Sequence, residues 1–259
     1  MIFDTHAHYD DRAFDEDREE VLAKVFASGV GCVVNIGADL KSSESSVRLA
    51  GGDERIWAAV GIHPESVDEA GDEGIMILRD LIKNSPRVRA VGEIGLDLHY
   101  GKGSLEEQKE AFLRQWDLAD EFDLPVVVHS RDAAQATFDI IKERFVKAGK
   151  PLKAVMHCYS YEKEQALEYV KMGLYIGVGG VLTFKNGRKL REAVLEIPTD
   201  RILLETDCPY LAPEPFRGSR NDSSNIRYVV DALSELRGIA TEEIERITFE
   251  NARNFYGLS

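Results

Sequence analysis

Two histidines stand two residues apart at the start of the sequence, in MIFDTHAHYD. Ile2 and Phe3, followed by Thr5, predict a short strand, and side chains at alternate strand positions point to the same face. His6 and His8 should therefore face the same way, with their Cα atoms about 6–7 Å apart. This spacing suits two nitrogens that share a metal ion, but it also fits two polar side chains at a strand end, so the rest of the sequence must decide.

The other residues of ligand type also stand late in apolar runs. Five of the six histidines close such a run, and His99 follows just beyond one. Scattered surface histidines would not follow this pattern, which therefore predicts a metal centre. The later candidates are His63 in GIHP, Glu93 and Asp97 in GEIGLD, His129 in VVVHSRD, His157 in VMHCYS and Asp207 in LLETDCPYL. Glu93 and Asp97 share one strand face, where Gly95 between them leaves room.

Eight apolar runs, rich in β-branched residues, alternate with helical patterns. They are Met1–Thr5, Cys32–Gly37, Ile56–His63, Val88–Asp97, Pro125–Ser130, Ala154–Tyr159, Leu174–Gly180 and Arg201–Asp207. Among the helical patterns, Leu105–Phe122 follows a possible capping box of Ser104 and Glu107, and Thr241 is the expected cap of a helix at 241–256. Eight such repeats predict a parallel sheet covered by helices.

The length of 259 residues favours one α/β architecture, a (β/α)8 barrel, in which residues 1–259 form a single domain. The alternative is an open doubly wound sheet, which normally carries a glycine-rich phosphate loop after an early strand. Gly29 and Gly31 do not form such a loop. In a barrel of this kind, catalytic groups lie at the C-terminal ends of the strands, where the histidines and acids are predicted to be.

Composition limits the class of protein further. Hydrophobic residues make up 44% of the chain, which is enough for a large core, and no apolar run has membrane-spanning length. The first strand begins without a secretory signal ahead of it, and three cysteines without a CxxC pair favour a reducing cytoplasm. The net charge of −14 argues against nucleic-acid binding by bulk electrostatics, unless positive charge is supplied locally, for example by bound cations.

The cysteines are not expected to be ligands. Cys158 and Cys208 stand one residue out of phase with His157 and Asp207, so they should face the helices as buried small side chains. Cys32 starts an apolar run and is expected in the core. Four histidines and two carboxylates then exceed the needs of one ion and fit two divalent cations that share a carboxylate. Nitrogen and oxygen donors suit Zn²⁺, Mn²⁺, Mg²⁺ or Fe²⁺, and the lack of thiolates argues against a purely structural zinc site.

Together, these blocks resemble the TatD family of metal-dependent deoxyribonucleases, in the amidohydrolase superfamily. The matching stretches occur in order along the whole chain. They are DTHAH (4–8), VGIHP (60–64), VGEIGLD (91–97), PVVVHSRDA (125–133), HCYS (157–160), GVGG (177–180), ETDCPYLAP (205–213), FRGSRN (216–221) and FENARNF (249–255).

The resemblance implies a set of roles. One divalent cation would be held by His6, His8, Glu93 and Asp207, and a second by Glu93, His129 and His157. His63 would contact substrate or support a ligand, and Arg131, Arg217 and Arg220 would contact phosphate, although an ordinary strand-end histidine and solvated arginines fit the sequence as well. One departure is Ser223, which stands where the family usually has a proline, and His99 receives no role.

The expected reaction is hydrolysis of DNA phosphodiester bonds, from an end or in single strands, by water that two cations activate. Glu93 and Asp207 are the expected catalytic residues, and Asp207 would also accept a proton from that water. A different hypothesis is hydrolysis of a small amide, ester or lactone at the same centre, since a fold does not determine a function. A third is a non-catalytic metal-binding module. The protein is expected to be a cytoplasmic monomer or weak oligomer that does not associate with membranes.

Overall fold

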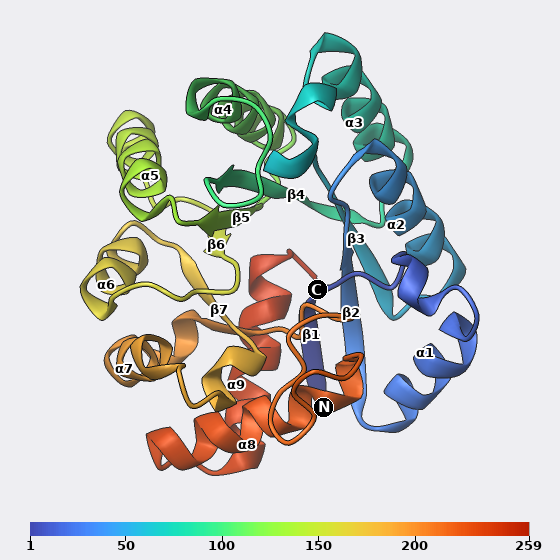
Figure 1. Cartoon of the computed structure of the whole chain (residues 1–259), viewed down its shortest axis with the longest axis vertical. Helices are drawn as coiled ribbons and strands as arrows, with labels where there is room; N and C mark the ends of the chain where they lie inside the picture. The colour runs from blue at the N-terminus through green and yellow to red at the C-terminus, as the bar shows by residue number, and fades with distance from the viewer. Residues whose placement is uncertain (259) are drawn as a thin grey trace. The chain divides into compact units, whose positions relative to one another are not determined.

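The computed structural model describes residues 1–258. Its eight strands form one sheet in which neighbours follow chain order, from β1 to β8 (Figure 1). The chain divides into two compact units, and each is described here by itself. The first unit contains residues 1–35, 158–171 and 175 onward, and the second contains residues 36–157 and 172–174.

The first unit contains the outermost parts of the sequence. Its strands are β1 (Ile2–Ala7), β2 (Val30–Ile36, of which the last residue falls in the second unit), β7 (Tyr175–Val178) and β8 (Ile202–Leu204). Its α-helices are α1 (Arg18–Ala27), α6 (Lys163–Lys171), α7 (Arg188–Glu196), α8 (Ile226–Arg237) and α9 (Thr241–Phe255). Short 3-10 turns are η1 (Arg12–Phe14), η3 (Gly180–Thr183), η4 (Thr199–Arg201) and η5 (Ser223–Asn225).

The C-terminal helix α9 holds the first and last strands of this unit. The ring of Phe3 on β1 lies 5.8 Å from Phe249 and 6.0 Å from Tyr256. The Tyr256 hydroxyl donates a hydrogen bond to the Thr5 carbonyl, and Asn251 Nδ2 donates to the Ile202 carbonyl at the start of β8. These contacts explain why a helix at the end of the chain is needed to place residues at its beginning.

The second unit contains the middle of the sequence. Its strands are β3 (Ile56–Val60), β4 (Val88–Asp97), β5 (Val126–Arg131) and β6 (Ala154–Met156). Its α-helices are α2 (Leu40–Gly52), α3 (Asp72–Asn84), α4 (Leu105–Glu121) and α5 (Ala134–Ala148), and the 3-10 turn η2 covers Pro64–Glu69. The strands pair in parallel, with Ala59 opposite Ala90 and Gly95 opposite His129.

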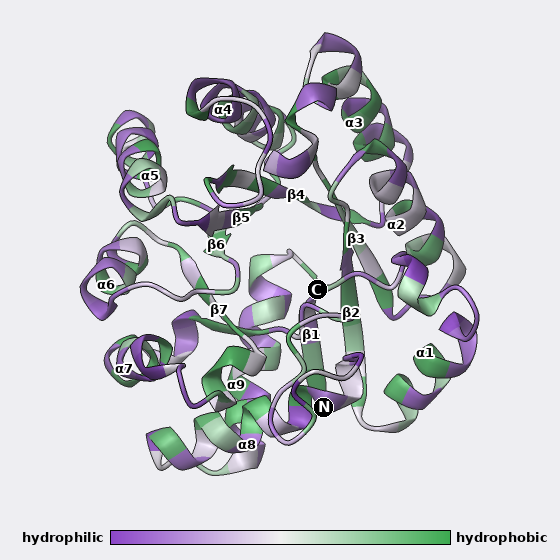
Figure 2. Cartoon of the chain, viewed as in Figure 1, coloured by the Kyte–Doolittle hydropathy of each residue, from purple (hydrophilic) through white to green (hydrophobic). Residues whose placement is uncertain are grey.

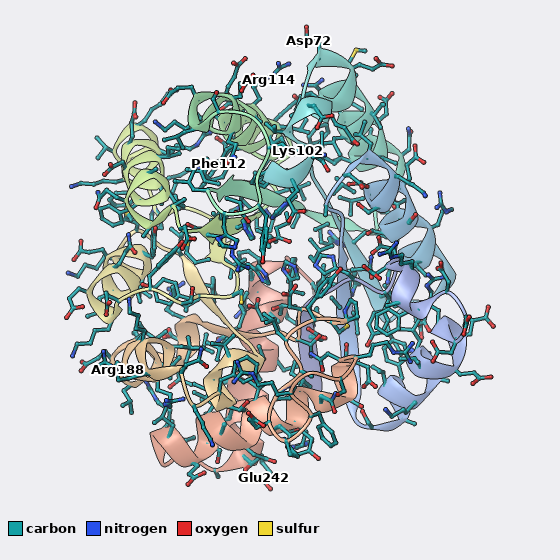
Figure 3. All side chains as sticks on the ribbon, in the orientation of Figure 1. Asp72, Lys102, Phe112, Arg114, Arg188 and Glu242 are labelled. Atoms are coloured by element: carbon teal, nitrogen blue, oxygen red, sulfur yellow. The ribbon has the colours of Figure 1, made fainter. Side chains whose placement is uncertain are left out.

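Helix α4 shows how this unit positions polar residues. Ser104 and Glu107 form the predicted capping box. Phe112 is buried beside Trp116, whereas Arg114 lies on the outer side and pairs with Asp72 (Figure 3). Two buried glutamines on the inner side, Gln108 and Gln115, are seven residues apart and therefore two helical turns apart on one face. Gln108 bonds to the backbone of Asp97, and Gln115 bonds to the backbone of Ile62.

Several expectations from the sequence need correction. Thr241 is the first residue of α9 rather than its cap: Ala240 is the N-cap, and the Thr241 hydroxyl bonds to Ser234 instead. Cys32 lies within β2 rather than at its start and is only partly buried, as is Cys158, so the core prediction holds only for the fully buried Cys208. The strand before His63 ends at Val60, and the strand before Asp207 ends at Leu204, so both residues lie in loops.

Hydropathy follows the expected division within each unit. The strands are mostly hydrophobic, and each helix presents hydrophilic residues on one side (Figure 2). Over residues 1–258, none of the helices combines the length and the apolar character that crossing a membrane requires.

Candidate metal centre

The first unit brings together three of the predicted ligands, which we call the β1/β8 group: His6, His8 and Asp207. His6 Nε2 and His8 Nε2 are 3.1 Å apart, and Asp207 Oδ1 lies 3.7 Å and 3.3 Å from them, respectively. Backbone hydrogen bonds fix the two segments, because Asp207 N–H donates to the His6 carbonyl and His8 N–H donates to the Cys208 carbonyl. Two imidazole nitrogens and a carboxylate oxygen that converge so closely form a donor set that fits a divalent cation.

A buried carboxylate, Asp4, supports this group from behind. Its Oδ1 accepts the backbone N–H groups of His6 and Thr206, and its Oδ2 accepts the hydroxyls of Thr206 and Ser223, each at 2.5 Å. Burial raises the pKa of Asp4 to about 6, although these hydrogen bonds oppose the shift. Asp4 therefore links the segment before His8 to the segment before Asp207, and Ser223 is part of that link.

The second unit brings together the other three predicted ligands, which we call the β4/β6 group: Glu93, His129 and His157. Glu93 Oε1 lies 2.7 Å from His129 Nδ1 and 3.7 Å from His157 Nε2. Glu93 and His157 are buried, and His129, two residues before the end of β5, is largely buried. Glu93 Oε1 thus faces an imidazole nitrogen on each side, and such donors suit a divalent cation. Around His129 itself, the ligand atoms that lie within 4.8 Å of one another belong to His63, Asp97 and His129.

Asp97 also contacts this group, although the sequence assigned it no ligand role. Its Oδ2 lies 3.0 Å from His129 Nε2, so His129 has an acidic partner at each ring nitrogen. Burial opposes protonation of His129, but the hydrogen bonds to Asp97 and Glu93 outweigh it and raise the pKa of His129 to about 9. Burial would raise the pKa of Asp97, yet the bonds from His129, Tyr100 and His99 hold it well below its usual value.

His63 lies beside the same group. Its ring centre is 4.2 Å from that of His129, in an edge-on arrangement. His63 caps the turn η2, because its Nδ1 accepts the backbone N–H of Glu65. The capping bond occupies Nδ1 and fixes the ring orientation.

The three predicted phosphate contacts differ in their surroundings. The Arg131 guanidinium lies 4.5 Å from the centre of the Tyr100 ring, and that of Arg217 lies 4.2 Å from the centre of the Phe184 ring. Stacking of this kind holds an arginine while leaving its N–H groups able to bind an anion. Arg220 instead forms an ion pair with Asp17, with Nη2–Oδ2 at 2.5 Å, and donates to the Ala13 carbonyl.

Glu205 is a buried acid that the sequence interpretation missed. Its Oε1 accepts the backbone N–H of Cys158 at 2.6 Å. A Cβ atom on Gly177 would lie 2.5 Å from Glu205 Oε2, which explains why the first residue of the GVGG block is a glycine. Glu205 stands two residues before Asp207, and this strand-like spacing is the signal that could have identified it.

Comparisons with known proteins identify the family to which the chain belongs. The family model described as "TatD related DNase" matches residues 3–257. An uncharacterized metal-dependent hydrolase of Bacillus subtilis, YabD, is 39% identical over 100% of both chains. A protein of Klebsiella pneumoniae named 3'-5' ssDNA/RNA exonuclease TatD is 32% identical over 99% of this chain and 98% of its own.

The fold prediction is confirmed by a solved relative. The crystal structure of YjjV, a TatD homologue from Escherichia coli, superposes with a TM-score of 0.90 at 30% identity, covering 100% of this chain and 98% of that one. The strand order and this match agree with the (β/α)8 barrel and not with the open doubly wound sheet. The chain therefore belongs to the TatD-related DNase family and is a metal-dependent hydrolase.

Proposed function

We propose that this protein hydrolyses the phosphodiester bonds of nucleic acid, acting on single-stranded DNA from an end. The observation that carries this proposal is the match over nearly the whole chain to TatD-related enzymes, including one named as an exonuclease. The β1/β8 and β4/β6 groups support it, since each places imidazole nitrogens within 4 Å of a carboxylate oxygen, and these are donors that catalytic divalent cations use.

We assign one divalent cation to each group. The candidate ions are Zn²⁺, Mn²⁺ and Mg²⁺. Bound cations of this kind neutralise phosphate charge and lower the pKa of water from about 15.7 toward 7. The net charge of −14 argues against nucleic-acid binding by bulk electrostatics, but bound cations would supply positive charge at the site itself.

The chain's own residues supply the remaining functions. Asp207 is the proposed proton acceptor as well as a ligand, because it lies in the loop after β8 and its carboxylate is partly exposed. Glu93 is the proposed acidic ligand of the β4/β6 group. His63, Arg131, Arg217 and Arg220 are the proposed contacts to the substrate. In this proposal, residues 1–259 act as one hydrolase domain in the cytoplasm, as a monomer or weak oligomer.

The test uses single-stranded DNA labelled at its 3' or its 5' end, with Mg²⁺, Mn²⁺ or Zn²⁺ added to metal-stripped protein. We expect stepwise shortening from one end, no activity with chelator, and strongly reduced activity in Asp207→Asn. Asp132→Asn is the matched control, because Asp132 is exposed and pairs with His99, which is not among the proposed ligands. Folded, metal-loaded protein that leaves DNA intact with every cation would refute the proposal.

A panel of small amides, esters and lactones belongs in the same experiment. The acidic surface favours an uncharged substrate over a polyanion, and this is the observation behind the second candidate, an amidohydrolase. Turnover of a panel member without DNA cleavage would replace the nuclease by this function.

A further inference from the structure

The loop that follows β4, residues 98–103, lies mostly on the surface, but its first part is firmly held. Asp97 Oδ1 accepts the backbone N–H groups of His99 and Tyr100, each at 2.7 Å. The Asp97 side chain is 1% exposed, so water does not compete for these two bonds. The backbone of Tyr100 is therefore fixed before any ligand binds, and so is the direction in which its side chain leaves the loop.

The far end of the same loop is fixed as well. Gln108, which is buried on α4, donates from Nε2 to the carbonyls of Asp97 and Lys102, at 3.0 Å and 3.1 Å. The Lys102 N–H donates to the Pro64 carbonyl at 3.0 Å, which ties the loop to the turn η2. Because both ends are held, the exposure of the side chains on this loop does not come from a loose backbone.

Tyr100 carries an aromatic ring that packing orients but does not cover. The Arg131 guanidinium lies 4.5 Å from the centre of this ring, and the His99 ring meets it edge-on, with the two centres 4.2 Å apart. Tyr100 is nevertheless 57% exposed. A ring that its neighbours orient and that remains accessible offers a flat surface on which a planar ligand can stack.

This ring lies beside the β4/β6 group. Asp97 binds the Tyr100 N–H through Oδ1, while its Oδ2 lies 3.0 Å from His129 Nε2. Arg131 stands two residues after His129 on β5, and alternate residues of a strand face the same side. A ligand with an anionic group at His129 would therefore bring the adjoining part of its chain to Arg131 and Tyr100.

The combination of an arginine and an exposed tyrosine favours one class of ligand. A guanidinium binds phosphate and an aromatic ring stacks on a nucleobase, so the pair fits a nucleotide unit. A small amide, ester or lactone needs neither contact. Bases in a duplex already stack on one another, whereas the bases of a single strand are available to a protein ring. The pair therefore favours single-stranded nucleic acid over the small substrates of an amidohydrolase.

We propose that Tyr100 stacks on a base of single-stranded nucleic acid next to the phosphodiester bond held at the β4/β6 group, while Arg131 contacts the adjoining phosphate. The inference deepens the proposed function and rests on it, because it takes nucleic acid as the substrate. Stacking on an aromatic side chain contributes about 5–100-fold to affinity for each base and depends little on sequence. It releases no counterion, so it should not vary with salt as a phosphate contact does.

Binding of a fluorescein-labelled single-stranded DNA tests the ring directly, with phosphorothioate linkages that resist cleavage and with Mg²⁺-loaded protein. We expect Tyr100→Ala to raise Kd about 5–100-fold and Tyr100→Phe to leave it near the wild-type value, because the ring remains. Leu98→Ala is the matched control, since Leu98 is 49% exposed on the same loop and has no ring. Wild-type affinity in Tyr100→Ala would overturn the inference, as would equal losses in Tyr100→Ala and either of the other two variants.

The salt dependence of Kd separates stacking from an indirect effect through Arg131. For single strands, each phosphate contact contributes about 0.7 to the slope of log Kd against the logarithm of the salt concentration. Arg131→Ala should lower this slope by about 0.7, whereas Tyr100→Ala should weaken binding by the same factor at every salt concentration. If Tyr100→Ala lowers the slope as much as Arg131→Ala does, Tyr100 only holds Arg131 and the stacking role is refuted.

A third measurement changes the DNA and so does not depend on a substitution. One abasic nucleotide, moved along the strand, should weaken binding to the wild type most at the stacked position. At that position Tyr100→Ala should add no further loss, because the base and the ring are partners. The absence of any such position would overturn the inference even if Tyr100→Ala failed to fold. Wild type that neither binds nor cleaves single-stranded DNA would refute the proposed function, whereas cleavage without an abasic effect would refute this inference alone.

Discussion

The two donor groups are held in different ways. In the β1/β8 group, the backbone does most of the positioning: His6 and Asp207 are joined by a main-chain hydrogen bond, and Asp4 binds the backbone of His6 and Thr206. In the β4/β6 group, side chains do it: Glu93 and Asp97 contact the two nitrogens of His129.

This difference follows from where the ligands lie. Glu93 and His129 lie on strands β4 and β5, whose pairing already fixes their backbones, so only the ring orientation remains to be set. Asp207 lies three residues beyond β8 with φ at +57°, a left-handed conformation that is uncommon outside glycine. A loop in this conformation needs external support, which the Asp4 network provides.

The largest expected effect is loss of the acid in either group. Asp207→Asn and Glu93→Gln should each lower kcat on DNA by about 10²–10⁴-fold, because each removes a proposed ligand and Asp207 also accepts a proton. Steady-state kinetics with saturating metal would measure it. If only one of the two variants lost activity, the groups would not be equally required.

Next in size is a substitution that would force apart the backbones of β4 and β5, the strands that carry Glu93 and His129. Gly95 has φ at +150°, and a Cβ atom there would lie 2.0 Å from the His129 carbonyl oxygen. Gly95→Ala should reduce the free energy of unfolding by about 3 kcal/mol, by strain and by overpacking against β5. Urea unfolding would measure this, with Gly52→Ala as control, since a Cβ atom on Gly52 meets nothing within 4 Å. Equal stability of the two variants would contradict the tight approach of β4 to β5.

Ser223 offers a smaller change, confined to the β1/β8 group. Ser223→Ala removes one hydroxyl donor from buried Asp4, so the free energy of unfolding should fall by about 1–3 kcal/mol. Ser223→Pro should cost more, because proline also lacks the N–H that Ser223 donates to the Tyr9 hydroxyl. Denaturant curves would rank the variants, and a proline variant as stable as wild type would show that Ser223 does not support this loop.

The smallest expected effect concerns Arg220 and Asp17. If Arg220 contacts phosphate, Asp17→Asn frees it and should lower KM for DNA a few-fold, while Arg220→Ala should raise KM. Both shifts should shrink as salt is added, because exposed charges are screened. Kinetics at two salt concentrations would test this, and KM values unchanged in both variants would remove Arg220 from the substrate contacts.

The sequence predicts much of the site because strand alternation and strand ends are local properties. They correctly place His6 beside His8, and they correctly place Glu93 on β4. The bond between Asp97 and His129 was not predictable, because it depends on how two neighbouring strands are aligned. Nor was the contact of Ser223 with Asp4, which joins residues 219 positions apart.

Two errors have the same physical origin. The apolar runs continue past the ends of the strands, so His63 and Asp207 were expected at strand ends but lie in loops. An apolar run indicates that a segment is buried, not that it pairs in a sheet, and a buried loop can be as apolar as a strand. Thr241 has the residue type of an N-cap, but its hydroxyl bonds to Ser234 on the preceding helix, a contact that the local sequence does not reveal.

The central claim is that each donor group holds its own divalent cation, and counting cations tests it most directly. Elemental analysis after zinc loading should find two ions per wild-type chain. It should find one ion after His6→Ala with His8→Ala, and one after His129→Ala with His157→Ala. A wild-type chain that holds fewer than two ions, while folded and free of chelator, would contradict the account.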